Sequence, residues 1–96
     1  SLPAIEAVLE KYLVSEKDEG PVLAVEARGS ETCELVLFTI RYIDRETVNR
    51  YIRESGLSGL HNIRTVIRLE AIPTLGTGKT DYRTLKAMLV KQYLSN

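Results

Sequence analysis

The chain has 96 residues, 44% hydrophobic and 27% charged, which is the composition of one small globular domain rather than of a disordered segment. Thirteen basic and thirteen acidic side chains cancel, so no net field favours nucleic acid or an anionic membrane surface as a partner. No apolar run is long enough to span a bilayer, and no signal-peptide pattern is present. The one cysteine, Cys33, cannot form an internal disulfide, and we expect a buried, inert thiol.

The first predicted element is an amphipathic helix over residues 3–14, whose apolar stripe is formed by Ile5, Val8, Leu9 and Tyr12 or Leu13. Its charged residues, Glu6, Glu10 and Lys11, are expected to face solvent. A polar loop follows over residues 15–20. Because the chain begins at Ser1 without a methionine, we interpret it as a piece of a longer protein.

Two strands are predicted next, over residues 22–28 and 33–40, with Leu23, Val25 and Ala27 on one face of the first. The turn signal at residues 29–32 predicts that they form an antiparallel hairpin. The second strand contains the uninterrupted apolar run 35–38, which is typical of a central strand covered by helices on both faces.

The second half predicts a helix, a strand and a last helix. Asp44 is the candidate N-cap of the first of these helices, and Gly56 is expected to end it in a left-handed conformation. Residues 63–70 alternate as a strand, which a right-handed crossover would place parallel to its neighbour. The expected buried positions are Val48, Tyr51 and Ile52 in the helix, Ile63, Thr65, Ile67 and Leu69 in the strand, and Tyr82, Leu85, Met88 and Leu89 in a helix over 81–92. The predicted fold class is α+β: a three-stranded mixed sheet flanked by three helices.

A glycine-rich loop with one lysine separates the last strand from the last helix. Pro73 cannot donate a ladder hydrogen bond and should end the strand, while Gly76 and Gly78 allow conformations that a β-carbon would forbid. Thr80 is the candidate N-cap of the helix, so Lys79 would lie on a mobile loop at the positive helix end. The triplet 78–80 also matches the end of a Walker phosphate-binding loop, but a proline occupies position 73, where that motif has its first glycine.

The segment from Ile72 to Lys86 resembles the last conserved motif of adenylate-forming enzymes, in which a proline precedes a Gly-Lys pair and a leucine closes the motif. These are the acyl-CoA synthetases, peptide-synthetase adenylation domains and luciferases. Residues 75–81, and also 1–6 and 35–39, are most similar to the acyl-acyl carrier protein synthetase part of the bifunctional 2-acylglycerophosphoethanolamine acyltransferases.

The resemblance implies that residues 1–96 are the C-terminal lid domain of a larger ligase, inactive alone, with Lys79 as the catalytic lysine. The loop residues Gly76, Thr77, Gly78 and Thr80 would contact substrate or ATP. The resemblance also implies that ATP and Mg are bound mainly by an N-terminal adenylation domain of the same chain, and that a fatty acid is activated and passed to acyl carrier protein or CoA. It implies a cytoplasmic enzyme, with attachment of the parent to the inner membrane left open.

A binding module is the competing interpretation. Arg45, Arg50, Arg53 and Arg64 would then dock an acidic carrier protein, although a solvated helix face is the favoured explanation for the first three. Ile63 stands where the family usually has a proline before the arginine that Arg64 matches. His61 is the only histidine and has no ligand cluster near it in sequence, so no metal site is expected.

Overall fold

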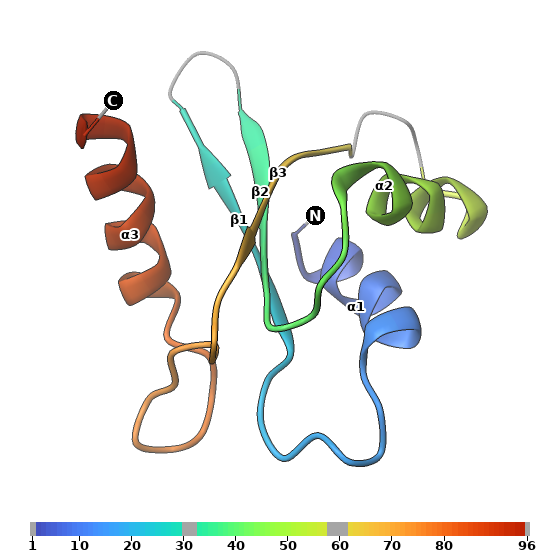
Figure 1. Cartoon of the computed structure of the whole chain (residues 1–96), viewed down its shortest axis with the longest axis horizontal. Coiled ribbons are helices and arrows are strands. Elements are labelled where there is room, and N and C mark those ends of the chain that lie inside the picture. Colours follow the sequence, from blue (N-terminus) through green and yellow to red (C-terminus); the bar gives the residue numbers. More distant parts are fainter. Residues whose placement is uncertain (1, 30–32, 58–61, 96) are drawn as a thin grey trace.

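The computed structural model describes residues 2–29, 33–57 and 62–95, with side chains described as far as Lys91. Within these residues the elements, in chain order, are α1 (Leu2–Leu13), β1 (Leu23–Arg28), β2 (Glu34–Thr39), α2 (Arg45–Glu54), β3 (Ile63–Arg68) and α3 (Tyr82–Ser95). The strands form one sheet in the order β1-β2-β3, with an antiparallel β1-β2 pair and a parallel β2-β3 pair. In Figure 1 α3 lies on one side of the sheet and α1 and α2 on the other. The predicted α+β class is confirmed.

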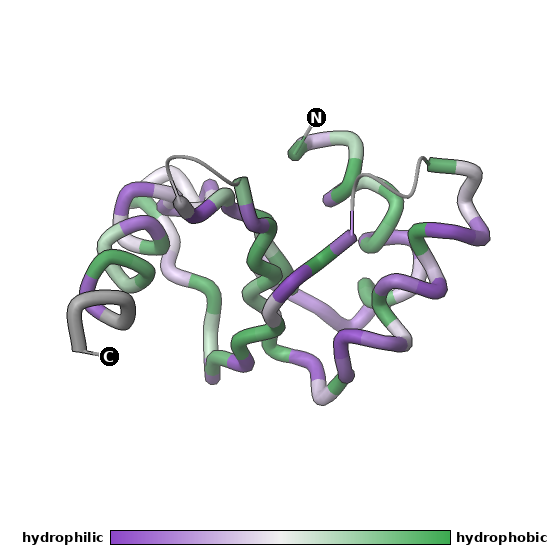
Figure 2. Tube along the Cα trace, turned by 90° about the horizontal axis from the view of Figure 1, so that it is seen from above, coloured by the Kyte–Doolittle hydropathy of each residue, from purple (hydrophilic) through white to green (hydrophobic). Residues whose placement is uncertain are grey.

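The central strand β2 divides the hydrophobic core into two layers. Leu37 points to the layer shared with α1 and α2, whereas Val36 and Phe38 point to the layer shared with α3, and all three side chains are fully buried. Seen from above in Figure 2, the hydrophobic strands lie between α3 and the α1–α2 layer. The apolar run of this strand therefore has the role predicted for it, because both of its faces are covered.

The α1–α2 layer is the larger one, and the α3 layer is small. The first contains the buried residues Ile5, Leu9, Leu13, Val22, Leu23, Val25, Leu37, Val48, Ile52 and Ile63. The second contains Ala24, Val36, Phe38, Ile72, Leu85 and Leu89. Both caps predicted for α2 are confirmed: the Asp44 carboxylate accepts from the Thr47 amide at 2.7 Å, and Gly56 has φ +87°.

The simple alternation predicted for the third strand is wrong, because β3 contains a bulge. Leu35 of β2 pairs with Ile63, but Val36 pairs with Thr65, so Arg64 is the extra residue. The bulge changes which side chains share a face: Ile63 and Val66 pack on the α1–α2 side, and Ile67 packs on the α3 side. Val66, which was expected to face outward, is thus half-buried.

Three other positions differ from the expectation. Cys33 is exposed just before β2 rather than buried inside a strand. On α3, Leu85 and Leu89 are buried as predicted, but Tyr82 is 38% and Met88 37% exposed. The reason is that α3 packs along β1 with a narrow apolar stripe, which among the α3 side chains described, residues 82–91, buries those one turn apart at 85 and 89.

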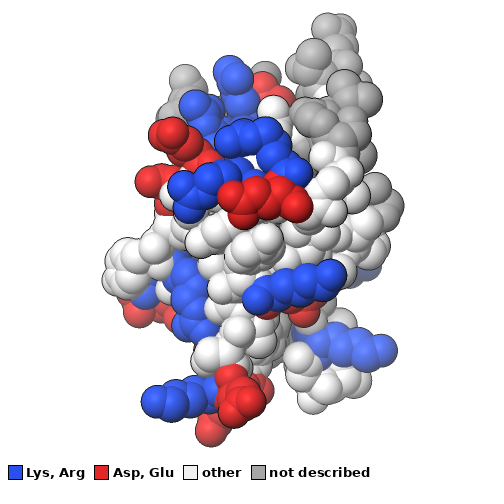
Figure 3. Space-filling view, turned by 90° about the vertical axis from the view of Figure 1, so that its right-hand side faces the viewer, with Lys and Arg blue, Asp and Glu red and all other residues white. Residues whose placement is uncertain are grey.

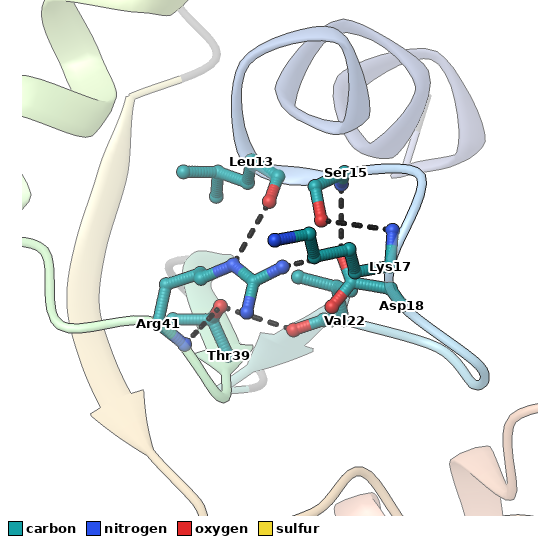
Figure 4. Close-up of polar contacts among 7 residues, drawn as sticks. All are labelled: Leu13, Ser15, Lys17, Asp18, Val22, Thr39 and Arg41. Atoms are coloured by element: carbon teal, nitrogen blue, oxygen red, sulfur yellow. Dashed lines mark hydrogen bonds and ion pairs between the residues drawn. The ribbon is translucent and has the colours of Figure 1, made fainter.

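The long loop between α1 and β1 is tied to the end of β2 by Arg41 (Figure 4). The Arg41 guanidinium donates to the Leu13 carbonyl at 3.0 Å and forms an ion pair with Asp18. The pKa of Asp18 lies below its ordinary value, mainly because its carboxylate accepts a hydrogen bond from the Ser15 amide and, as the second cause, one from Arg41. No helix among the described residues has both the length and the apolar character needed to cross a membrane.

Candidate functional site: the Lys79 hairpin

Residues 73–81, here called the Lys79 hairpin, leave the sheet and return to begin α3. The segment enters at Ile72, which is buried in the α3 layer at 5% exposure. The amide of Asp81 donates to the Pro73 carbonyl at 2.8 Å, and Thr74 and Thr80 form an antiparallel bridge. The predicted loop is therefore a short two-stranded hairpin at the lower end of the sheet in Figure 1.

The tip of the hairpin is a tight turn closed by two backbone hydrogen bonds. The Gly78 amide donates to the Leu75 carbonyl at 2.9 Å, and the Leu75 amide donates to the Lys79 carbonyl at 2.8 Å. Gly78 has φ +89°, in the left-handed region that favours glycine. Gly76 is not in that region, so only one of the two glycines needs the conformational freedom expected of both.

Asp81, rather than Thr80, caps α3. The Asp81 carboxylate accepts from the Thr84 hydroxyl at 2.7 Å and from the Thr84 amide at 3.1 Å, and its carbonyl accepts from the Leu85 amide. These bonds, first of all the one from the Thr84 hydroxyl, lower the pKa of Asp81 below its ordinary value of 3.8. The capping aspartate fixes the direction in which α3 leaves the hairpin.

Lys79 is exposed at the base of the turn, and within the described residues its ammonium makes no ion pair. It is thus a cation on a hydrogen-bonded hairpin rather than on the loosely held loop that was expected. The geometry also argues against a Walker loop, since the amides of Leu75, Gly78 and Asp81 already donate within the hairpin and are not free to cradle a phosphate.

The other predicted loop residues lie beside Lys79. Gly76, Thr77 and Gly78 are exposed at the turn, while Thr80 is half-buried. An open hollow adjoins the hairpin and is lined by Leu75, Thr80, Asp81, Tyr82 and Arg83. With Leu75 49% exposed, this end of the domain presents a cation next to apolar surface.

Two carboxylates near the start of α3 were not recognised from the sequence. Glu6, expected to face solvent, accepts from the Val25 amide at 2.8 Å and from the Tyr82 hydroxyl at 2.7 Å. Glu26 of β1 is 4% exposed, and its Oε2 has the Lys86 ammonium 3.3 Å away without a well-formed hydrogen bond. Glu26 could have been recognised from the sequence, because it is a charged residue between apolar residues of a strand. No local signal pointed to the contact between Glu6 and Tyr82, which are 76 residues apart.

Two of the four predicted docking arginines, Arg45 and Arg64, lie at the N-terminal end of β3. Arg45 donates to the Arg64 carbonyl at 3.2 Å, and both side chains line an open hollow with Asn49, Asn62 and Ile63. Arg64 is the bulge residue of β3, and its backbone carbonyl meets the side chain of Arg45 in the first turn of α2. The structure thus brings Arg45 and Arg64 together, although they are far apart in sequence.

The two remaining arginines of α2 are solvated. Arg50 pairs with Glu54 at 3.9 Å and lies over the Tyr51 ring, and Arg53 is exposed. Figure 3 shows basic and acidic side chains interleaved on the face that α1 and α2 occupy. Because neighbouring charges of opposite sign cancel, a mixed surface of this kind attracts an acidic partner only weakly. His61 lies outside the described residues.

No protein-family model matches the chain. Among solved structures it is similar to the amide bond synthetase McbA from Marinactinospora thermotolerans, with 19% identity over 91% of this chain and a TM-score of 0.70. It is also similar to a fatty acyl CoA synthetase from Mycobacterium tuberculosis (22% identity, 88% of this chain, TM-score 0.65) and to O-succinylbenzoate coenzyme A synthetase from Bacillus subtilis (16%, 91%, 0.61).

The fold of this chain is thus one that occurs in adenylate-forming ligases. The chain spans 18%, 16% and 17% of the lengths of these three proteins, so it corresponds to a small part of each.

Proposed function

We propose that this domain is the C-terminal lid of an adenylate-forming acyl ligase, and that Lys79 is its catalytic lysine. The observation that carries the proposal is the exposed Lys79, which has no ion-pair partner among the described residues. It lies on a closed hairpin that leads into a capped helix. The fold shared with adenylate-forming ligases supports it, as does the resemblance of residues 72–86 to the lysine motif of that superfamily.

The proposed chemistry needs a mobile positive charge. A carboxylate oxygen of the acid attacks the α-phosphorus of ATP, the bond to the β-phosphate oxygen breaks, and pyrophosphate leaves with the released electron pair. Attacking carboxylate and phosphate repel each other, so a lysine that contacts both lowers the barrier electrostatically and holds the reacting atoms together. Nothing within the described residues would need to be displaced from Lys79 before it acts, because it has no ion-pair partner there.

The second half-reaction would use another part of the same domain. A thiol loses its proton and attacks the acyl carbon of the acyl-adenylate, and AMP leaves. Lys79 follows the C-terminal end of β3, whereas Arg45 and Arg64 lie at its N-terminal end, so one domain offers two cationic sites at opposite ends of a strand. A lid that turns between half-reactions would present them in succession.

For the substrates we propose a fatty acid and the phosphopantetheine thiol of acyl carrier protein. The similarity of residues 75–81 to acyl-acyl carrier protein synthetases supports this choice. CoA is the alternative thiol donor, and the similarity to a fatty acyl CoA synthetase supports it. An N-terminal domain would bind ATP and Mg, and the acyl donor would form on that domain.

The test is Lys79→Ala in the full-length ligase, with the two half-reactions measured separately. We expect acid-dependent ATP–pyrophosphate exchange to fall by about a hundredfold or more, or about 3–4 kcal/mol of transition-state stabilisation. Thioester formation from supplied acyl-adenylate should be nearly unchanged. Lys79→Arg should restore only part of the rate, because a planar guanidinium presents its donors differently from an ammonium.

Lys91→Ala is the matched control, since Lys91 is an exposed lysine of α3 away from the hairpin, and it should leave both half-reactions intact. Stability should change by no more than about 0.5 kcal/mol in either variant. Equal losses in both half-reactions, or no loss in either, would refute the role of Lys79. A deficit that grows or fades with salt would instead favour a docking role.

A further inference from the structure

The Lys79 hairpin is anchored to the domain at two apolar points that lie in the same layer. Ile72 precedes it and Leu85 follows it, and both are buried between the sheet and α3. Contacts at these two points alone would still allow the hairpin to rotate about the line that joins them. A third contact outside that layer would therefore decide where Lys79 points.

The third contact is made by Glu6 of α1 with Tyr82, the first residue of α3. The Tyr82 hydroxyl oxygen lies 2.7 Å from Oε2 and 2.9 Å from Oε1 of Glu6. The same Oε2 accepts from the Val25 amide of β1 at 2.8 Å. One carboxylate thus joins three elements, α1, β1 and α3.

The open edge of the sheet explains why Glu6 is held in place. Because the Ile40 amide donates to the Val22 carbonyl, the alternation of an antiparallel pair directs the Val25 amide away from β2 and out of the sheet edge. An unpaired backbone amide at a sheet edge costs free energy if it is buried, and if it is exposed it can pair with the strand of another chain. The Glu6 carboxylate accepts the hydrogen bond of this amide and removes both problems. The Val25 amide therefore holds the carboxylate independently of Tyr82.

The surroundings keep Tyr82 a hydrogen-bond donor. Partial burial, followed by the hydrogen bond to Glu6 and the charges of Glu6, Glu26 and Glu10, raises the pKa of Tyr82 well above its ordinary value. Its ring is 38% exposed beside the open hollow, so packing alone holds it weakly. The hydroxyl contact thus adds a restraint that packing does not supply.

We propose that Glu6 and Tyr82 are positioning residues for the adenylation half-reaction, acting as a brace that orients the Lys79 hairpin. The proposal rests on the proposed function of Lys79 for its catalytic part. Tyr82 directly follows Asp81, whose amide closes the hairpin on the Pro73 carbonyl. A shift at Tyr82 is therefore passed to Lys79, only three residues away, through a hydrogen-bonded segment rather than being absorbed by a loose loop.

The experiment uses the full-length ligase with four single variants and one double variant. Tyr82→Phe and Glu6→Ala each remove the brace, and Glu6→Gln keeps an acceptor for both donors. Glu16→Ala is the control, because Glu16 is an exposed glutamate in the loop after α1 and is not among the groups that act on Tyr82. For each protein we would measure amide hydrogen exchange over residues 74–80, and then the kcat and KM of pyrophosphate exchange.

We expect Tyr82→Phe and Glu6→Ala to accelerate hydrogen exchange in the hairpin about tenfold and to lower the kcat of adenylation about tenfold. The KM values for ATP and acid should stay within about twofold, and thioester formation should not change, since the brace acts through Lys79. Glu6→Gln should retain most of the activity. The double variant Glu6→Ala/Tyr82→Phe should lose no more than Glu6→Ala alone, because Glu6→Ala already removes the contact with Tyr82.

The outcomes separate the two proposals. Unchanged hydrogen exchange in Tyr82→Phe would overturn the brace. Faster exchange with unchanged kcat would overturn its catalytic part. If Lys79→Ala fails to slow adenylation while the hairpin still loosens in Tyr82→Phe, the proposed function fails and the mechanical brace stands. Should Glu6→Ala fail to fold, Tyr82→Phe and Glu6→Gln still decide the matter, since both are nearly isosteric.

Discussion

The turn that presents Lys79 offers a matched pair of substitutions, Gly78→Ala and Gly76→Ala. A β-carbon added at either glycine would meet no atom within 4 Å, so steric contact does not distinguish them. What differs is the backbone, since only Gly78 has a positive φ, at +89°. An alanine forced into that region costs about 1–2 kcal/mol. At Gly76 an alanine should be neutral or stabilise by up to about 1 kcal/mol, because it restricts the unfolded chain.

The assay is urea denaturation of the chain followed by far-UV circular dichroism. Gly78→Ala should lower the free energy of unfolding by about 1–2 kcal/mol, and Tm by about 4–8 °C for each kcal/mol in a domain of this size. Gly76→Ala should leave both unchanged or slightly raised. If Lys79 has the proposed role, Gly78→Ala in the full-length protein should also slow pyrophosphate exchange, because the hydrogen bond from the Gly78 amide to the Leu75 carbonyl shapes the turn. Equal costs at the two positions, or a larger cost at Gly76, would refute the assignment of the left-handed residue.

Two further predictions concern the helix caps and the arginines. Because the pKa of Asp81 is lowered in the folded state, its cap stabilises the domain above the ordinary value of 3.8 and is lost as the pH falls through the folded pKa. Asp81→Ala should therefore lower Tm at pH 7 and make little difference at the acid end of a pH series; a constant deficit across that series would contradict the cap. If Arg45, Arg50 and Arg53 dock acyl carrier protein as the binding-module interpretation holds, reversing their three charges together should raise the KM for that protein about tenfold at low salt and spare adenylation. An unchanged KM would mean that these arginines form a solvated helix face.

Much of the architecture could be predicted from the sequence because its signals are local. The Asp44 cap, the left-handed Gly56 and the apolar stripe of α2 lie within a few residues of the backbone groups that they serve. The uninterrupted apolar run of β2 likewise shows that both faces are covered, whatever covers them. Pro73 and Gly78 likewise marked a strand end and a turn, but the sequence predicted a mobile loop here and not the hairpin that the structure shows.

The candidate site was only partly predictable for the same reason. Lys79 could be selected from its motif. The conformation of the backbone around it, however, depends on the pairing of amides with carbonyls across the turn, which the motif does not specify. Thr80 and Asp81 are both good N-caps by residue type, and the bridge between Thr74 and Thr80 leaves Asp81 to cap α3. The choice between two adjacent caps is thus made by the hairpin and not by cap preference.

The remaining features were decided by the tertiary structure. The bulge at Arg64 exists only in the register of β3 against β2, and it moves Val66 to the covered face. Glu6 follows the pattern of a solvent-facing helix residue, yet its carboxylate binds Val25 and Tyr82. Sequence periodicity records which face of an element is apolar. It carries no record of which distant donor a polar side chain meets, because that is determined only when the helices and the sheet edge pack together.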